Sequence, residues 1–421
     1  MRLYNSLTDT LEAFHPIGPT VTVYVCGITP YDTTHLGHAF TYTVFDVLIR
    51  YLEAQGRTVR YVQNVTDIDD DILRKSREVG EDWWSLGNRW TRHFIEDMIA
   101  LNVRPPDQYP RATDVIPDII AAVQDLLAAG VAYESGGSVY YRVAANPDFG
   151  RISRLAPAEM LAVANERGNI PDDPHKEDPL DFVLWQAHKP GEPSWPSPWG
   201  PGRPGWHIEC STMARRFLGE SIDIHGGGGD LLFPHHACEI AQVEPLTGRP
   251  FVRFWLHVAM VHHAGAKMSK SLGNLIMVRD LLRTWSADAV RLYLAGHHYR
   301  RSWAHDEGEL ALAQMAAHRL KAAVTVAGGM AEPAAARRER WQEAIRRFEA
   351  AMANDLDTPQ ALAALDELAV AVLDAAAQGV DVAAVQQELR GRCRLFGLRL
   401  DADEPEDRVR RGWESHCQRF L

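Results

Sequence analysis

Two strand-like runs separated by one helical segment constrain the fold of this chain more than any other feature. Residues 21–26 (VTVYVC) form a short β-branched run closed by Gly27, and residues 40–56 carry apolar side chains at helical spacing before a glycine. Residues 58–67 (TVRYVQNVTD) predict the next strand. A β-α-β unit of this kind begins a doubly wound parallel sheet, in which ligands bind at the carboxyl ends of the strands.

The same pattern recurs later in the chain. Residues 221–230 (SIDIHGGGGD) predict a strand that runs into glycines, residues 235–246 predict a helix, and residues 251–261 predict a further strand. Between about 100 and 190 the pattern changes to helices and a segment rich in Pro and Asp, which indicates an insertion. After about residue 305 the chain is rich in Ala and Leu at helical spacing, which favours a helical bundle.

Length and charge set the broad class. A chain of 421 residues is expected to form more than one domain. We predict an α/β domain over 1–305, a helical bundle over 306–400 and a C-terminal tail over 401–421.

The formal net charge of −12 argues against a protein that coats nucleic acid with its whole surface. The chain shows no membrane-length apolar run, no signal-peptide pattern and no CxxC motif among its five cysteines, so we expect a cytoplasmic protein without a membrane partner.

A pair of histidines, His35 and His38, falls at the start of the first predicted helix. Thr33 and Thr34 precede them as candidate N-caps, and Gly37 would let a ligand approach the backbone. Free N–H groups at a helix start, together with two imidazoles, suit phosphate oxygens. Taken alone, the HxGH pattern is equally compatible with histidines that only cap or pack.

Lys267 and Lys270 lie three residues apart in a glycine-flanked segment, AGAKMSKSLGN, after a late predicted strand. Two such lysines suit a clamp on a polyphosphate, although a segment of this kind is more often a solvated turn. Together and in this order, the two motifs resemble the HIGH and KMSKS signatures of class I aminoacyl-tRNA synthetases. The resemblance implies that ATP with Mg²⁺ is a substrate and that His35, His38, Lys267 and Lys270 are catalytic.

Four further side chains form a plausible metal-binding set. Cys26 ends the first predicted strand, Cys210 follows GWHIE, and His235 and Glu239 lie one helical turn apart. Two thiolates, an imidazole and a carboxylate are a plausible tetrahedral zinc set, with one Zn²⁺ per chain.

A zinc ion beside an adenylate-forming site suggests the substrate. Binding in a pocket separates similar side chains by only about 1–3 kcal/mol, whereas a thiolate binds zinc directly and a hydroxyl binds it poorly. We therefore expect L-cysteine to be activated without editing. His236 could take the place of His235 as a ligand, whereas Cys238, on the opposite helix face, is expected in the core.

The sequence closely resembles the cysteinyl-tRNA synthetases and their shorter relatives, the mycothiol ligases, which join cysteine to the amino group of glucosaminyl-inositol. The resemblance runs from about residue 2 to 400 through YVCG, YVQNVTDIDD, KPGEPSW, GRPGWHIEC, DIHGGGGDLLFPHH, KMSKSLGN and NDLDTPQALAAL. It implies a Rossmann-like class I synthetase catalytic domain followed by a helical bundle. By analogy, the adenylate and nucleotide site comprises Gly27, Ile28, Thr29, Gly37, Thr41, Asn64, Val65, Thr66, Trp206, Gly228, Gly229, Asp230, Met268, Ser269 and Ser271.

The sequence carries features of both branches. Pro30, Phe40, Asp71 and the segment ERGNIPDDP look like the ligase form, although residues 169–170 depart from the ligases' Glu-Arg-Gly-Gly-Asp-Pro. The chain also ends about 20 residues beyond LFGLRL, which leaves no room for the anticodon-reading domain of the tRNA enzymes. In contrast, Glu239 matches the fourth zinc ligand of the tRNA enzymes. We favour a small amine acceptor of the amino sugar-inositol type, with tRNA-Cys as the alternative.

Two other function classes account for part of the pattern. A zinc-stabilised binding protein without catalysis would not be expected to retain all four catalytic candidates. A nucleotidylyltransferase would use the ATP motifs but gives no role to Cys26, Cys210 and His235. The basic stretch at 336–347 alternates in sign with glutamates, so we interpret it as a solvated helix face rather than a tRNA contact.

Overall fold

A four-stranded parallel sheet lies at the centre of the molecule. The computed structural model describes residues 1–263, 265–268, 273–400 and 406–418. The strands run in the order β10-β9-β3-β4 and comprise β3 (Thr20–Ile28), β4 (Thr58–Val65), β9 (Ile222–Gly228) and β10 (Val252–Val258). The strand order reverses between β3 and β9, and the crevice at the carboxyl ends of such a strand pair is where ligands bind in doubly wound folds.

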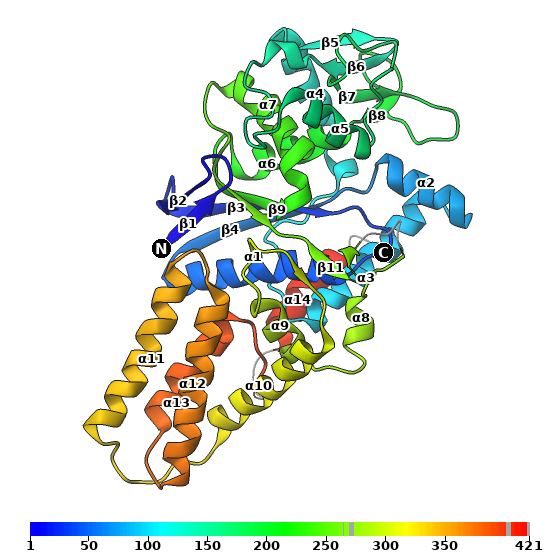
Figure 1. The fold of residues 1–421 in the computed structure, drawn as a ribbon. Helices are drawn as coiled ribbons and strands as arrows, with labels where there is room; N and C mark the ends of the chain where they lie inside the picture. The colour runs from blue at the N-terminus through cyan, green and yellow to red at the C-terminus, as the bar shows by residue number, and fades with distance from the viewer. Residues whose placement is uncertain (264, 269–272, 401–405, 419–421) are drawn as a thin grey trace.

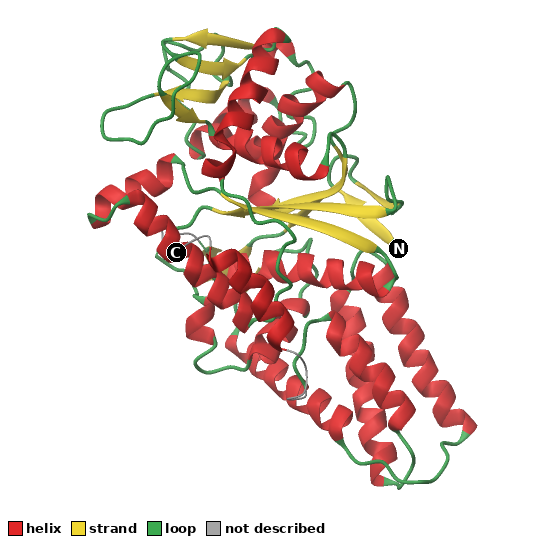
Figure 2. Ribbon diagram, turned by 180° about the vertical axis from the view of Figure 1, so that it is seen from behind, coloured by secondary structure: helices red, strands yellow, loops and turns green. Residues whose placement is uncertain are grey.

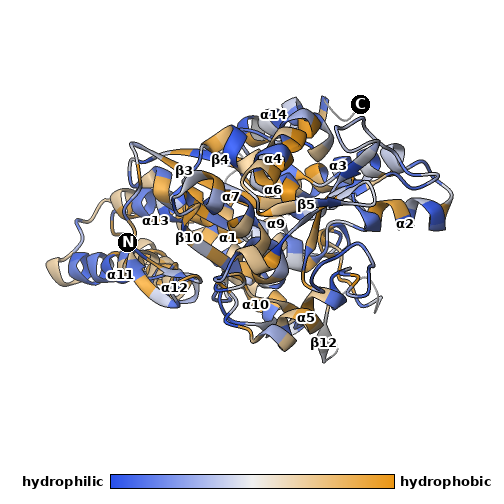
Figure 3. Cartoon of the chain, turned by 90° about the horizontal axis from the view of Figure 1, so that it is seen from above, coloured by the Kyte–Doolittle hydropathy of each residue, from blue (hydrophilic) through white to orange (hydrophobic). Residues whose placement is uncertain are grey.

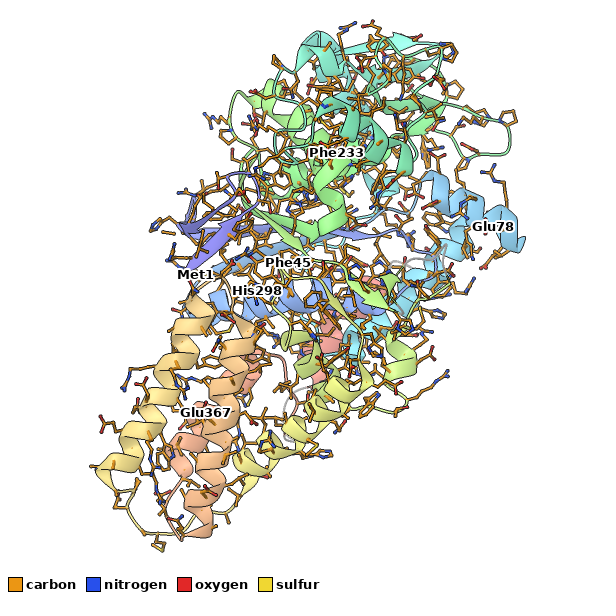
Figure 4. All side chains as sticks on the ribbon, viewed as in Figure 1. Met1, Phe45, Glu78, Phe233, His298 and Glu367 are labelled. Carbon is orange, nitrogen blue, oxygen red and sulfur yellow. The ribbon has the colours of Figure 1, made fainter. Side chains whose placement is uncertain are left out.

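Helices cover both faces of this sheet, which confirms the predicted doubly wound α/β class. The helices α1 (Leu36–Ala54) and α9 (Ala287–Ala295) lie on one side, and α6 (Trp206–Leu218) lies on the other, with α7 (Ala237–Thr247) packed against α6 (Figures 1 and 2). Phe45 projects from α1 toward the sheet (Figure 4). A Cβ added at Gly226 of β9 would lie 2.1 Å from its ring, so close packing of α1 on β9 requires a glycine there.

The start of α1 differs from the prediction. The expected N-caps, Thr33 and Thr34, do not cap the helix. Instead, His35 Nδ1 accepts hydrogen bonds from the backbone N–H groups of Gly37 at 3.1 Å and His38 at 3.3 Å. The backbone of His35 is extended, so its ring folds back over the first turn as a shorter polar side chain does in an ordinary cap.

The chain between β4 and β9 contains a second sheet that the sequence analysis did not predict. Four antiparallel strands in the order β5-β6-β7-β8 lie in the upper part of Figure 1. These strands are only three to six residues long and are separated by segments rich in Pro, Gly and Asp, so they carry little periodic signal. Their bounds are β5 (Ala132–Ser135), β6 (Ser138–Tyr141), β7 (Phe182–Ala187) and β8 (Gly202–Pro204). The helices of this part are α2 (Asp70–Val79), α3 (Trp83–Ala100), α4 (Ile116–Ala128) and α5 (Pro157–Glu166).

Two small sheets complete the region around the central sheet. A hairpin of β1 (Arg2–Asn5) and β2 (Thr10–Ala13) lies near the N-terminus. The second small sheet has the order β12-β11-β13 and is followed along the chain by the helical region. Its strands are β11 (Val261–His263), β12 (Ala266–Lys267) and β13 (Trp303–Ala304), and α8 (Val278–Leu281) lies between β12 and β13 in sequence.

The last part of the chain is helical. The helices α10 (Glu307–Thr325), α11 (Ala335–Ala353), α12 (Thr358–Ala377) and α13 (Ala383–Leu395) pack together at the lower left of Figure 1. Viewed from above, α11 is largely blue whereas orange gathers on central elements such as α1 and α9 (Figure 3). Glu343 and Arg346 form an exposed ion pair on α11 at 2.6 Å, as expected for a solvated face. None of the described helices is long and apolar enough to cross a bilayer.

The segment after the bundle returns to the region around the central sheet. The helix α14 (Glu406–Cys417) packs against α3. Trp413 is fully buried there, contacts the rings of Phe94 and Tyr109, and donates a hydrogen bond from Nε1 to the carbonyl of Val103 at 2.8 Å. The predicted C-terminal tail therefore includes a docked helix.

Candidate functional site

Four buried side chains converge at the carboxyl end of β3. Cys26 comes from β3, Cys210 from α6, His235 from the turn before α7 and Glu239 from α7. One ligand atom from each lies within 4.8 Å of all the others, and His235 Nε2 is 3.1 Å from Glu239 Oε1. The structure thus brings together the four residues of the predicted metal-binding set, a donor combination typical of zinc.

A second donor set overlaps the first. Cys26 and Glu239 also lie within 4.8 Å of His225 and His236, and all four of these residues are buried. His236 Nε2 is 3.4 Å from Cys26 Sγ, and its Nδ1 is 2.7 Å from Nε2 of His257. His225 Nε2 is 2.9 Å from Glu239 Oε2. Sequence reasoning anticipated His236 as an alternative but missed His225, whose only signal is its place next to the glycines that end β9.

Burial and mutual contacts set the charges in this cluster. The hydrogen bond with Cys26 lowers the pKa of Cys210 to about 6, whereas burial raises the pKa of Cys26. Burial opposes ionisation of Glu239, but His225 and His235 hold its pKa at about 2. Burial also disfavours the charged form of His235, but Cys210 and Glu239 raise its pKa to about 10. At neutral pH the Cys210 thiolate and the Glu239 carboxylate are therefore ionised, whereas Cys26 and His235 hold protons that a divalent metal must displace when it binds.

Predicted adenylate-lining residues adjoin this cluster. The Trp206 ring stacks on His235 with centroids 4.5 Å apart, and Asn64 Oδ1 accepts a hydrogen bond from Gly27 N–H at 2.8 Å. Asn64 Nδ2 donates to Thr66 Oγ1 at 3.1 Å. A Cβ on Gly27 would lie 1.5 Å from the Asn64 carbonyl oxygen, so only glycine permits this approach of β3 to β4.

The HLGH motif (residues 35–38) lies close to Met268, in the described start of the KMSKS segment. The rings of His35 and His38 stack with centroids 3.7 Å apart. A Cβ built on Gly37 would be 4.0 Å from Cε of Met268, the buried methionine between the two motif lysines. Lys267 belongs to β12, whereas Ser269, Lys270 and Ser271 lie outside the described residues.

The chain just after KMSKS also pairs with the start of α1. Leu36 N–H donates to the carbonyl of Ile276 at 2.8 Å, and Val278 N–H donates to the carbonyl of Thr34 at 3.0 Å. Residues 276 and 278 are therefore hydrogen-bonded to the start of α1, although the two stretches are more than 200 residues apart in sequence.

The remaining predicted nucleotide residues are distributed around this edge of the sheet. Thr41 Oγ1 donates to the carbonyl of Gly37 at 3.1 Å, and Thr29 Oγ1 donates to Asp69 Oδ2 at 3.3 Å. Ile28 and Val65 pair across β3 and β4, and both side chains belong to the core.

The glycine run at the end of β9 meets the insertion. Gly228 ends the strand, Gly229 follows it, and Asp230 Oδ2 lies 3.3 Å from Nη1 of Arg167. Burial lowers the pKa of the nearby His257 to about 3, with Asp230 opposing that shift. The Arg167 contact places the ERGNIPDDP segment at the carboxyl edge of the central sheet.

Comparisons with known proteins give the family. The model for the tRNA synthetases class I (C) catalytic domain matches residues 13–315. The chain is 46% identical over 387 residues to a cysteine--tRNA ligase of Thermococcus onnurineus, a match that covers 88% of this chain and 80% of the relative. It is 45% identical over 381 residues to the L-cysteine:1D-myo-inositol 2-amino-2-deoxy-alpha-D-glucopyranoside ligase of Thermomonospora curvata, covering 90% and 89% of the two chains.

Solved structures agree on the fold. The methionyl-tRNA synthetase of Mycobacterium tuberculosis in complex with methionyl-adenylate superposes with a TM-score of 0.63 at 17% identity, covering 90% of this chain and 89% of that one. The leucyl enzyme of Agrobacterium radiobacter gives 0.65 at 12% identity, covering 97% and 86%. The fold, the convergent donor set and the sequence matches lead to one conclusion: the chain belongs to the family of class I tRNA synthetases (C), whose curated relatives are ligases.

Proposed function

We propose that this enzyme activates L-cysteine with ATP and selects it through a zinc ion held by Cys26, Cys210, His235 and Glu239. The observation that carries the proposal is the convergence of this buried donor set with Trp206 at the end of β3, the strand that precedes the HLGH helix α1 in the chain. When bound, the ion supplies a coordination position for the substrate thiolate, and serine's hydroxyl is a much poorer ligand. Relatives named as cysteine ligases support this assignment.

The phosphate motifs supply the chemistry of activation. The carboxylate of cysteine attacks the α-phosphorus of ATP, the cysteinyl-adenylate bond forms and pyrophosphate leaves. His35 holds the first turn of α1, while His38, Lys267 and Lys270 stabilise the charge that develops on the phosphates. The role of Lys270 rests on the motif alone because that residue lies outside the described part of the chain.

Pyrophosphate exchange tests this half of the reaction. With Mg²⁺ and ATP, purified enzyme is expected to exchange pyrophosphate when L-cysteine is supplied and not when L-serine is supplied. Metal analysis of the same sample should find about one zinc per chain, because the four donors converge on one site. Equal exchange with serine would overturn zinc-based selection.

For the second half of the reaction we propose a small amine acceptor of the amino sugar-inositol type. The amine nitrogen attacks the adenylate carbonyl, an amide bond forms, and AMP and a proton leave. The Arg167–Asp230 contact supports this acceptor, because it joins the glycine loop to the start of a segment that also carries the exposed carboxylate of Asp172. In the same segment, Asp173 is already engaged by the Tyr140 hydroxyl at 2.9 Å, so Asp172 is the better partner for an ammonium or hydroxyl group.

A specific observation favours the alternative acceptor, the 3′ end of tRNA-Cys. Glu239 lies within the donor set and contacts both His225 and His235, as expected if it is the fourth zinc ligand seen in the tRNA enzymes. Cysteine--tRNA ligases among the relatives are 44–48% identical to this chain, about as similar as the mycothiol-type ligases at 45% and 47%.

Side-by-side acceptor assays separate the two. We expect enzyme supplied with cysteine and ATP to release AMP faster with glucosaminyl-inositol than with tRNA-Cys. Both assays are run at low salt, which strengthens any tRNA contact and so favours the alternative acceptor. Anticodon-dependent cysteinylation of tRNA without a response to amino sugars would reverse the acceptor assignment and leave cysteine activation intact. Asp172→Asn should slow amide formation while exchange is unchanged.

A further inference from the structure

Trp303 is enclosed by three rings from other elements. His297 stacks on its face with centroids 3.8 Å apart and planes 13° apart. Tyr293 of α9 and Phe40 of α1 meet it edge-on, with centroids at 5.2 and 5.4 Å. We call Trp303, Phe40, Tyr293 and His297 the tryptophan box.

The His297 ring in this box is held at both nitrogens. Its Nδ1 lies 2.8 Å from the carbonyl oxygen of Tyr293, and its Nε2 lies 3.0 Å from Glu309 Oε2. The Tyr293 hydroxyl in turn accepts a hydrogen bond from Asp306 N–H at 2.9 Å and lies 3.0 Å from His305 Nδ1. Because polar contacts orient the rings around Trp303, the box is a fixed arrangement rather than an adaptable apolar cluster.

One side of the box supports the hairpin that carries Lys267. Trp303 starts β13, which pairs in parallel with β11 through Val261 opposite Trp303. The other edge of β11 pairs with β12, where His262 lies opposite Lys267. His305 N–H also donates to the carbonyl of His262 at 2.8 Å. Two strand pairings therefore connect Trp303 with the lysine-bearing strand.

The other side of the box is the HLGH helix. Phe40 is fully buried and lies only two residues after His38. Its edge contact with Trp303 is thus a direct packing link between the first turns of α1 and the sheet that includes Lys267. The hairpin and the helix must be held at the correct separation for their side chains to act on the same phosphates.

We propose that Trp303 is a positioning residue for adenylate formation, which sets the distance between the HLGH helix and the lysine-bearing hairpin through Phe40. The inference rests on the proposed ATP chemistry of these motifs. It concerns the rate of activation and not the recognition of cysteine, because the donor set is built from β3, α6 and α7 and the turn before α7.

The test is pyrophosphate exchange by Trp303→Ala, Trp303→Phe and Phe40→Leu. Misplacing reacting groups by about 1 Å can cost about 100-fold in rate. We therefore expect Trp303→Ala to lower kcat by about 10- to 100-fold, with the cysteine KM and the zinc content unchanged. Trp303→Phe retains an aromatic edge and should recover most of the rate. Trp199→Ala is the control, since this half-buried tryptophan packs on Trp185 in the insertion.

A double-mutant cycle distinguishes positioning from general packing. If Phe40 and Trp303 act through one contact, Phe40→Leu should add little to the loss caused by Trp303→Ala. Wild-type kcat in folded Trp303→Ala, or a loss matched by Trp199→Ala, would overturn the positioning role. If Trp303→Ala does not fold, Trp303→Phe and Phe40→Leu are tested instead. For these variants too, kcat and the cysteine KM are measured separately. Absence of cysteine-dependent exchange in the wild-type enzyme would instead overturn the proposed function itself.

Discussion

We propose that individual side chains at this edge of the sheet bind either the metal or the phosphates of ATP, and substitutions should separate the two roles. Cys210→Ala removes one of four donors, so we expect the zinc content to fall well below one per chain and the cysteine KM to rise, as measured by metal analysis and exchange kinetics. His38→Ala is the matched control. It should keep its zinc while exchange slows by about 10²-fold, because a transition-state contact is lost but no ligand is removed. Full zinc in Cys210→Ala would show that the ion uses the overlapping His225 and His236 set.

Asp67 should make folding stability depend on pH. Burial raises its pKa to about 6, although the Thr113 hydroxyl donates to Oδ2 at 2.6 Å. The folded chain then binds more protons than the unfolded chain between about pH 4 and pH 6. The contribution of this group to stability is present below pH 4 and is lost as the pH rises through 6, by on the order of 1–3 kcal/mol.

Urea unfolding at several pH values measures this effect. Asp67→Asn should flatten the stability profile between pH 4 and 6, because the amide cannot titrate and its oxygen still accepts the Thr113 N–H. The exposed Asp125→Asn serves as the control. An unchanged profile in Asp67→Asn would mean that other carboxyl groups dominate the pH dependence.

Secondary-structure elements are joined by a buried ion pair beneath the sheet. Arg291 of α9 and Asp46 of α1 pair with both side chains fully buried, and Arg291 also donates from Nη1 to the carbonyl of Leu101 at 2.8 Å. Its guanidinium packs so closely on Gly397, after α13, that an added Cβ would lie 2.6 Å away. One side chain therefore fastens α9 to α1 and to the end of the helical bundle.

Removing this arginine should be costly. Arg291→Met leaves the buried Asp46 with Arg50 as its remaining charged partner, and breaking a buried pair from one side typically costs about 3–5 kcal/mol. Urea denaturation should show this loss. Arg283→Met removes an exposed pair with Asp280 and should change stability by less than about 1 kcal/mol. Equal effects of the two substitutions would rule out a special role for the buried pair.

At the level of the whole chain, the C-terminal helix α14 packs against α3. Trp413→Ala removes a fully buried ring and its hydrogen bond to Val103, a change that typically costs about 3–5 kcal/mol. We expect faster hydrogen exchange in residues 94–109 and proteolytic cleavage near α14. Trp84→Ala, at a ring that is 42% exposed, is the control. If exchange at residues 94–109 stayed at the wild-type rate, α14 would not stabilise this part of the chain.

Local sequence patterns were sufficient for the central sheet and for the helices α1 and α7, whereas no helix was predicted at α6 or α9. The strands at 21–26 and 58–67 and the intervening helix were predicted because apolar periodicity over a long segment is a local property. The sheet β5-β6-β7-β8 was missed because pairing among strands of three to six residues is decided by distant partners. The His35 cap was missed for a related reason, since its ring reaches two N–H groups only in an extended backbone.

For the site, residue chemistry was enough to select Cys26, Cys210, His235 and Glu239 as candidate donors, and the structure brings these four together. Only the tertiary structure decided which groups meet: it added His225 to the cluster, placed Met268 near Gly37, and enclosed Trp303 with Phe40. The physical reason is that the type of donor side chain and the helical spacing of residues are local properties of the sequence. Contacts between β3, β9, α1 and β13 instead depend on how the sheet and its helices pack, which no short stretch of sequence specifies.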